Sequence, residues 1–239
     1  MRCASCHASA DMADIAAAVP KRGFIVAIDG PAGAGKSTLA RALAQRLHLP
    51  YVNTGLMYRA VAARALQAGI GLHDGAQLAE VARGFRFSLR PGRTVVELAI
   101  DRKRPGSTLS SREVEAVVSR TSSHPEVRAV MRAEQRQLGA DGCVMEGRDI
   151  GSVVFPDADV KIFLSALPRE RARRRERERG GARAAAETVA RRDALDNRTN
   201  PLEPAPDAAV LDTTRLNPRQ VLAQALELVE TTREKKASP

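Results

Sequence analysis

The chain has 239 residues, of which 44% are apolar, and its formal net charge of +10 gives an isoelectric point near 10.3. This length is enough for one α/β core with an inserted subdomain. No segment approaches the roughly 20 apolar residues of a membrane span, which excludes a transmembrane helix. The positive charge favours an anionic partner, either nucleic acid, a membrane surface or nucleotides.

The first 22 residues are small and rich in alanine, and we expect residues 1–22 to be a disordered extension. Their longest apolar run, Ile15 to Val19, is too short for a signal-peptide core, which predicts a cytoplasmic protein. Residues 3–7 (CASCH) match the spacing of a haem-attachment motif. Haem attachment requires export and structural zinc requires four ligands, so we expect neither group there.

The apolar run from Phe24 to Ile28 predicts a strand that is buried on both faces. A glycine-rich turn follows, and then apolar residues from Leu39 to Leu47 repeat at helical spacing. Further strands are predicted at 51–52, 143–145, 160–164 and 209–211, and helices at 55–68 and 113–138, the latter broken near 122–123. This alternation predicts an α/β fold with a five-stranded parallel sheet.

Residues 71–108 interrupt the alternation of strands and helices. Two short apolar runs, 85–89 and 95–100, flank Pro91 and Gly92 and predict an antiparallel hairpin. We interpret residues 71–120 as an inserted substrate-binding subdomain within one domain that spans 23–239.

A third segment, 167–198, contains 11 arginines, no lysine and six acidic residues. Residues 169–179 predict a charged helix that ends at Gly180 and Gly181. A local excess of arginine suits the binding of phosphate in a site better than a nonspecific basic tail does. We therefore predict a helical lid at about 167–198.

The strongest motif is GPAGAGKS, residues 30–37, which matches the phosphate-binding loop GxxxxGK[ST] between a strand and a helix. Lys36 should reach the β- and γ-phosphates of ATP, and the Ser37 hydroxyl should bind Mg²⁺. We expect the ATP-binding residues to be Gly30, Pro31, Ala32, Gly33, Ala34, Gly35, Lys36, Ser37 and Thr38. The motif by itself predicts a bound nucleoside triphosphate and leaves the reaction open.

Two further segments resemble the bacterial cytidylate kinases. Residues 53–59 (NTGLMYR) resemble the family pattern D-[ST]-G-x-x-Y-R, and residues 146–156 (EGRDIGSVVFP) resemble GRDxGTVVFPDA. The resemblance extends from about Phe24 to Leu228. It implies a nucleoside monophosphate kinase that uses ATP and Mg²⁺ to phosphorylate CMP or dCMP. We expect a monomer that has no nucleic-acid or membrane partner.

The resemblance implies that Arg59 and Arg148 bind the CMP phosphate, and each follows a strand end, where ligands gather in open α/β sheets. A guanidinium pairs well with phosphate oxygens, although a single arginine at such a position is more often in a surface ion pair. The resemblance also implies that Asp149 and Arg128 recognise the base, because a carboxylate accepts from the cytosine amine and rejects the uracil carbonyl. The remaining substrate contacts implied are Thr54, Tyr58 and Ser119.

The arginine-rich segment resembles the family's lid helix, x-E-x-R-A-x-R-R, at 167–175. Arg192 and Asp196 match an R-D-x-x-D motif that contacts ribose. We expect Arg171, Arg175 and Arg192 to close over the ATP phosphates, and we expect the catalytic residues to be Lys36, Arg148, Arg175 and Arg192. Glu146 is a candidate to hold a water on Mg²⁺ or, alternatively, a solubilising charge at a strand end.

The chain departs from the family pattern in three places. Asn53 stands where the family usually has Asp, and Ser110 where it commonly has Arg. Between Asp196 and Arg198 there is one residue rather than two, so we do not assign the family's last arginine to Arg198. These changes could weaken activity or alter the preference for dCMP.

Two other functions stay open at this point. One is a P-loop kinase for another acceptor such as UMP, AMP or shikimate. The other is a nucleic-acid-stimulated ATPase, which the charge suggests. Only 3% of the residues are aromatic and none is Trp, which leaves few platforms for base stacking and disfavours that second function.

Overall fold

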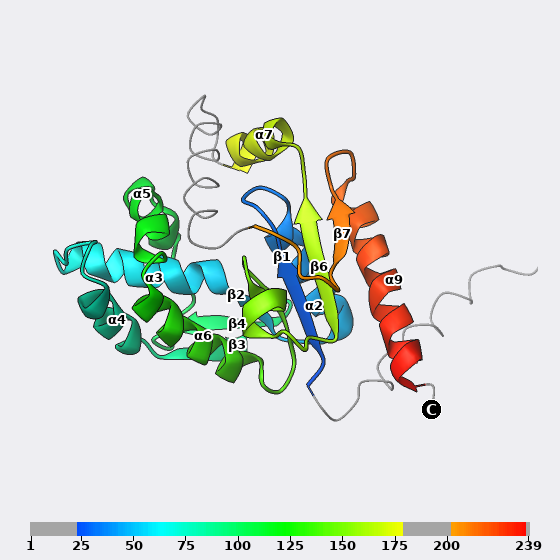
Figure 1. The fold of residues 1–239 in the computed structure, drawn as a ribbon, viewed down its shortest axis with the longest axis horizontal. Coiled ribbons are helices and arrows are strands. Elements are labelled where there is room, and N and C mark those ends of the chain that lie inside the picture. The colour runs from blue at the N-terminus through cyan, green and yellow to red at the C-terminus, as the bar shows by residue number, and fades with distance from the viewer. Residues whose placement is uncertain (1–22, 179–201, 238–239) are drawn as a thin grey trace, which may run out of the picture.

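The computed structural model describes residues 23–178 and 202–237 (Figure 1), so the expectations for residues 1–22 and for Arg192, Asp196 and Arg198 lie outside the described residues. The strands in the described part are β1 (Ile25–Asp29), β2 (Tyr51–Asn53), β3 (Phe87–Pro91), β4 (Val96–Ile100), β5 (Cys143–Glu146), β6 (Val160–Ser165) and β7 (Ala209–Asp212). They form one sheet in the order β3-β4-β2-β5-β1-β6-β7.

All the strands predicted from sequence are present within one or two residues of their expected bounds. β1 lies at the centre and pairs in parallel with β5 and β6, and β2 and β7 continue the sheet in parallel on either side. The strands β1, β5 and β6 are buried on both faces, which explains why they are continuous apolar runs rather than alternating ones.

The described sheet is larger than the predicted one: β2, β5, β1, β6 and β7 run in parallel, but the sheet as a whole is mixed and has seven strands because the hairpin joins it. The hairpin is present, with β3 antiparallel to β4, but β4 also pairs with β2 at Tyr51 and Glu97. Pairing with the hairpin satisfies edge groups of β2 that would otherwise be exposed. The boundaries of an insert at 71–120 and a lid at 167–198 stay predictions.

The helices of the described part are α2 (Lys36–Leu47), α3 (Thr54–Gln67), α4 (Gly75–Arg83), α5 (Arg112–Thr121), α6 (Pro125–Gly139), α7 (Pro168–Glu178) and α9 (Pro218–Ala237), with short turns η2 (Ser107–Ser110) and η3 (Ile150–Val154). Side chains of Asn53, Asp74 and Ser111 cap the starts of α3, α4 and α5. The predicted break between α5 and α6 is confirmed, with Pro125 in the first turn of α6.

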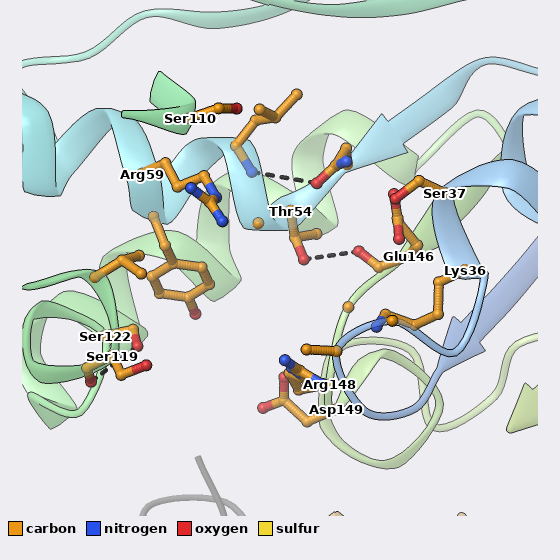
Figure 2. Close-up of a pocket in the computed structure, with 18 of the residues that line it drawn as sticks. Lys36, Ser37, Thr54, Arg59, Ser110, Ser119, Ser122, Glu146, Arg148 and Asp149 are labelled. Carbon is orange, nitrogen blue, oxygen red and sulfur yellow. Dashed lines mark hydrogen bonds between the residues drawn. The ribbon is translucent and has the colours of Figure 1, made fainter. Parts of the chain in front are cut away.

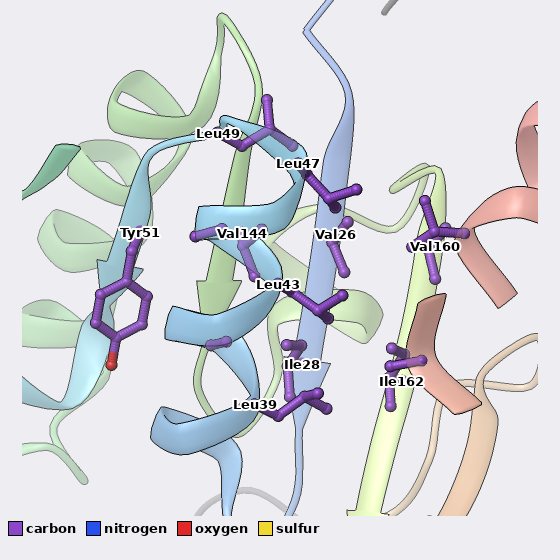
Figure 3. Packing of buried hydrophobic residues seen from close by; sticks show 14 of the residues in the cluster. Val26, Ile28, Leu39, Leu43, Leu47, Leu49, Tyr51, Val144, Val160 and Ile162 are labelled. Carbon is purple, nitrogen blue, oxygen red and sulfur yellow. The ribbon is translucent and has the colours of Figure 1, made fainter. Parts of the chain in front are cut away.

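The main core lies between α2 and the central strands (Figure 3). Leu39, Leu43 and Leu47 of α2 pack against Val26 and Ile28 of β1. Residues of α9 join the same cluster, and a second cluster packs α3, α4 and α6 against the hairpin. In the described part of the chain, no helix is long and apolar enough to cross a membrane.

Because β1, β2 and β5 run in parallel, the loops that follow them meet at one edge of the sheet. These loops are the glycine-rich loop after β1, the Asn53–Thr54 junction after β2 and residues 147–149 after β5. The sheet therefore brings the three motifs identified in the sequence to one place.

Candidate functional site

A pocket of about 310 Å³ lies at this edge of the sheet (Figure 2). The predicted site residues that line it are Ala32, Gly33, Gly35, Lys36, Ser37, Thr38, Thr54, Tyr58, Arg59, Ser119, Arg128, Arg148, Asp149 and Arg175. Gly30, Pro31, Ala34 and Arg171 were also predicted, but they do not line it. The pocket therefore joins the phosphate-binding loop to side chains from α3, α5, α6, α7 and the loop after β5.

The phosphate-binding loop has a backbone that only glycine adopts easily. Gly30, Gly33 and Gly35 have φ values of 140°, 78° and 98°. Gly35 precedes α2 and provides no side-chain cap, so the N–H groups at the start of the helix can bind an anion. The Lys36 Nζ donates to the carbonyl oxygens of Gly30 at 2.8 Å and Pro31 at 2.9 Å, which holds its charge within the loop.

The outer side of this loop is braced by α7. The buried Arg171 donates from Nη1 to the Ala32 carbonyl at 3.2 Å and from Nε to the Ala166 carbonyl at 3.0 Å. It thus contacts the backbone of the loop, and its predicted contact with ATP stays a prediction. A second support, which was not predicted, runs through Thr213: Arg174 donates to the Thr213 hydroxyl at 2.9 Å, and this hydroxyl donates to the Ala34 carbonyl of the loop at 3.0 Å. The position of Thr213 directly after β7 is the signal that could have revealed it.

Arg128 and Asp149, which the sequence analysis paired, are in direct contact. The Arg128 Nη2 lies 2.5 Å from the Asp149 Oδ2, and both side chains are almost fully buried. A second arginine that the sequence analysis missed, Arg132, donates to the same oxygen at 3.1 Å. Arg132 lies four residues after Arg128 on α6, a spacing that places both on one face of a helix.

Asp29, at the end of β1, holds the turn that carries Asp149. Its carboxylate accepts from the N–H groups of Ile150 at 2.8 Å and Gly151 at 2.7 Å. Burial raises the pKa of Asp29 from 3.8 to about 6; the two N–H groups oppose this shift and the nearby Asp149 adds to it. On the other side of the turn, Arg148 donates to the Gly30 carbonyl at 2.7 Å. Asp29 was not among the site residues predicted from the sequence.

Arg59 and Arg175 approach each other from different helices. Arg59 is held by a hydrogen bond to the Leu109 carbonyl at 3.0 Å. The buried Glu115 carboxylate of α5 lies 3.6 Å from the Arg59 Nη2 and 3.9 Å from the Arg175 Nη2. This one carboxylate offsets part of the positive charge of the two arginines and connects α3 with α7 beside the pocket.

Ser37 and Glu146 are the residues suited to a divalent metal. Both line the pocket, and the Glu146 Oε1 accepts from the Tyr51 hydroxyl at 2.6 Å. Burial and the adjacent Glu146 raise the pKa of Tyr51 well above its usual value, so Tyr51 stays a neutral donor. The described residues contain no cluster of three His, Cys, Asp or Glu side chains. This donor set fits Mg²⁺, which takes few protein oxygens and completes its shell with water and phosphate.

The departures from the family pattern are visible at the site. Asn53 accepts from the Leu56 N–H at 3.2 Å and donates to the Tyr51 hydroxyl at 3.2 Å, so an amide performs the capping role there. Ser110 lines the pocket with a short neutral side chain. The pocket also includes Ser122, which the sequence analysis did not select.

Comparison with known proteins shows the family to which this chain belongs. The family model described as cytidylate kinase matches residues 26–231. The cytidylate kinase of Geobacillus kaustophilus is 43% identical over 218 residues, which cover 87% of this chain and 97% of that protein. The cytidylate kinase of Citrifermentans bemidjiense is 44% identical over 225 residues, covering 90% and 94% respectively. The chain therefore belongs to the cytidylate kinase family.

Proposed function

We propose that this chain transfers the γ-phosphoryl group of ATP to CMP or dCMP, giving ADP and CDP or dCDP. The observation that carries the proposal is that one pocket contains both the phosphate-binding loop and the Arg128–Asp149 pair. Family membership supports the same reaction.

The ATP phosphates would lie in the loop from Gly30 to Thr38, where the start of α2 and Lys36 supply positive charge. Ser37 would hold Mg²⁺, with Glu146 orienting one of its waters. The metal, when bound, neutralises charge on the transferring phosphoryl group. Arg171 would support the loop from behind, and Arg175 would approach the phosphates from α7.

The acceptor phosphate would lie between Arg59 and Arg148, which line the pocket on either side of Thr54 (Figure 2). An oxygen of this phosphate is already anionic and can attack the γ-phosphorus directly while ADP leaves. The site therefore needs no dedicated base, and its contribution is alignment and charge stabilisation.

The base would be read by Asp149 and Arg128. Cytosine presents an amine donor beside the acceptors N3 and O2, which matches a carboxylate beside a guanidinium. Uracil presents a carbonyl at the amine position and an N–H at N3, so both protein groups would face the wrong partner. Buried polar groups left unpaired discriminate strongly between substrates. Tyr58 and Ser119 line the same region.

We extend the proposal to a cytoplasmic monomer acting on small nucleotides, with Arg192 and Asp196 contacting ribose and phosphates as the family pattern implies. Kinases of UMP or AMP stay the nearest alternative, and the Arg128–Asp149 pair disfavours them.

The test is a coupled assay of ADP formation with ATP and Mg²⁺ and with CMP, dCMP, UMP, AMP or no acceptor. We expect CMP and dCMP to give kcat/KM values well above those of the other acceptors. The control is Lys36→Ala, which should lower turnover by orders of magnitude in a protein that remains folded. Equal turnover with every monophosphate, or near-normal turnover of Lys36→Ala, would contradict the assignment.

A further inference from the structure

Arg132 is a partly buried arginine of α6 with one donor group left unpaired. Its Nη2 donates to the Asp149 Oδ2, but its Nε is buried and has no hydrogen-bond partner among the described residues. An unpaired buried N–H costs free energy. The hydrogen bond that the Arg132 guanidinium does make goes to Asp149, a carboxylate that lines the pocket.

Arg128 and Arg132 lie one turn apart on α6, where two like charges repel each other. Both approach the same oxygen of Asp149, at 2.5 Å and 3.1 Å. Arg128 lines the pocket, and Arg132 is outside the pocket lining. The carboxylate is thus held by one arginine that can reach a ligand and by another that supports the carboxylate from outside.

Two donors on one carboxylate oxygen restrict the rotation of the group more than one donor does. Side-chain hydrogen bonds from the described residues reach Oδ2, and this leaves Oδ1 for the ligand. Arg132 also lets Arg128 share its N–H groups between Asp149 and a base. When an N–H group of Arg128 turns to the base, Asp149 still has its hydrogen bond from Arg132.

We propose that Arg132 is a positioning residue for base recognition, which holds Asp149 in the orientation that accepts from the cytosine amine. This proposal rests on the proposed function, since it assumes that Asp149 reads the base. It assigns to Arg132 the selection of cytosine over uracil rather than the phosphoryl transfer itself.

The experiment compares kcat and KM for CMP and UMP in wild type, Arg132→Gln, Arg132→Met and Asp149→Asn. We expect both Arg132 variants to lower the CMP-to-UMP ratio of kcat/KM about tenfold, the size expected for losing a hydrogen bond to a charged group. The change should appear in KM for CMP, with kcat at saturating CMP and ATP nearly unchanged. Arg132→Met keeps the aliphatic packing in case the polar variant folds poorly.

The matched control is Arg120→Gln, which removes one positive charge from an exposed position on the neighbouring helix α5. Its ratio should equal that of wild type. A lowered ratio in Asp149→Asn together with an unchanged ratio in both Arg132 variants would overturn the role of Arg132 alone. An unchanged ratio in Asp149→Asn as well would overturn the assignment of base recognition to Asp149, and the role of Arg132 with it.

Discussion

At the scale of single residues, Asp29 illustrates how a site can be supported by a group that no ligand need contact. It is 8% exposed, and its two hydrogen bonds come from the backbone of the turn that follows Asp149. The position of Asp149, the carboxylate that we propose recognises the base, thus depends on a second, buried carboxylate at the end of β1. Burial opposes the charge of Asp29, and the two N–H donors favour it.

The raised pKa of Asp29 predicts a pH dependence of stability. Between about pH 4 and pH 6 the unfolded chain releases this proton while the folded protein keeps it, so Asp29 reduces the free energy of unfolding as pH rises. A shift from 3.8 to about 6 corresponds to about 3 kcal/mol. At pH 4 the unfolded chain has already lost part of this proton, so we expect the stability lost in Asp29→Asn, measured by urea denaturation, to be about 2 kcal/mol smaller at pH 7.5 than at pH 4.

Asp141→Asn, at an exposed position, is the matched control for that comparison. The same difference between wild type and Asp29→Asn at both pH values would show that Asp29 keeps its ordinary pKa in the folded protein.

Residue by residue, the sequence predicted those side chains that lie inside recognisable motifs. Lys36, Arg59 and Arg148 were found in this way and line the pocket. Arg132 and Arg174 were not found, because each acts through a partner distant in the chain, Asp149 and Thr213 respectively. A helix rich in arginine does not reveal which of its side chains face a carboxylate on another element.

At the scale of elements, the phosphate-binding loop is fitted closely to the neighbouring strand. A Cβ at Gly30 would lie 2.2 Å from the Leu164 carbonyl oxygen of β6, and Gly30 has a φ of 140°. The Leu164 carbonyl is part of the backbone of β6, so it cannot move away from an added Cβ as the end of a flexible side chain could. The loop conformation therefore depends on glycine at this position for two reasons, space and backbone angle.

We accordingly expect Gly30→Ala to lower the free energy of unfolding by about 3 kcal/mol or more, through strain and close contact. Gly69→Ala is the matched control, because Gly69 also has a positive φ, 66°, but nothing lies within 4 Å of its Cβ position. That variant should cost about 1 kcal/mol. Chemical denaturation of both variants measures the difference, and equal losses would mean that the contact with Leu164 is relieved without cost.

Most elements could be predicted from the sequence because their apolar patterns are local. The strand at Cys143–Glu146 and the break before Pro125 are examples. The attachment of the hairpin could not be predicted, because the pairing of Tyr51 with Glu97 joins two segments 46 positions apart through backbone hydrogen bonds. Backbone pairing leaves no residue pattern that would identify the partner strand.

At the scale of the whole molecule, part of the formal charge of +10 is concentrated around the pocket. Arg59, Arg128, Arg148, Arg175 and Lys36 all line one pocket. Positive side chains around a concave site attract anionic substrates over a distance comparable to the Debye length. Part of the positive charge therefore serves a nucleotide-binding site. From composition alone, the same charge was also compatible with binding to nucleic acid.

This charge predicts that KM for CMP rises several-fold between 50 mM and 500 mM NaCl, because salt screens the attraction. The value of kcat should change much less, since charges in direct contact with bound substrate are screened weakly. Steady-state kinetics across the salt series measures both parameters. A KM that is independent of salt would mean that the surrounding charge contributes little to nucleotide binding.

The sequence by itself determined the strands, most of the helices, the phosphate-binding loop and the motifs after β2 and β5, because each depends on residues close together in the chain; the helices α4 and α9 were not predicted. Only the tertiary structure decided that β3 and β4 extend the main sheet, that Asp29 supports the turn after Asp149, and that Arg132 shares Asp149 with Arg128. The physical reason is that these features are contacts between distant segments, whose geometry is set by how the sheet and helices pack.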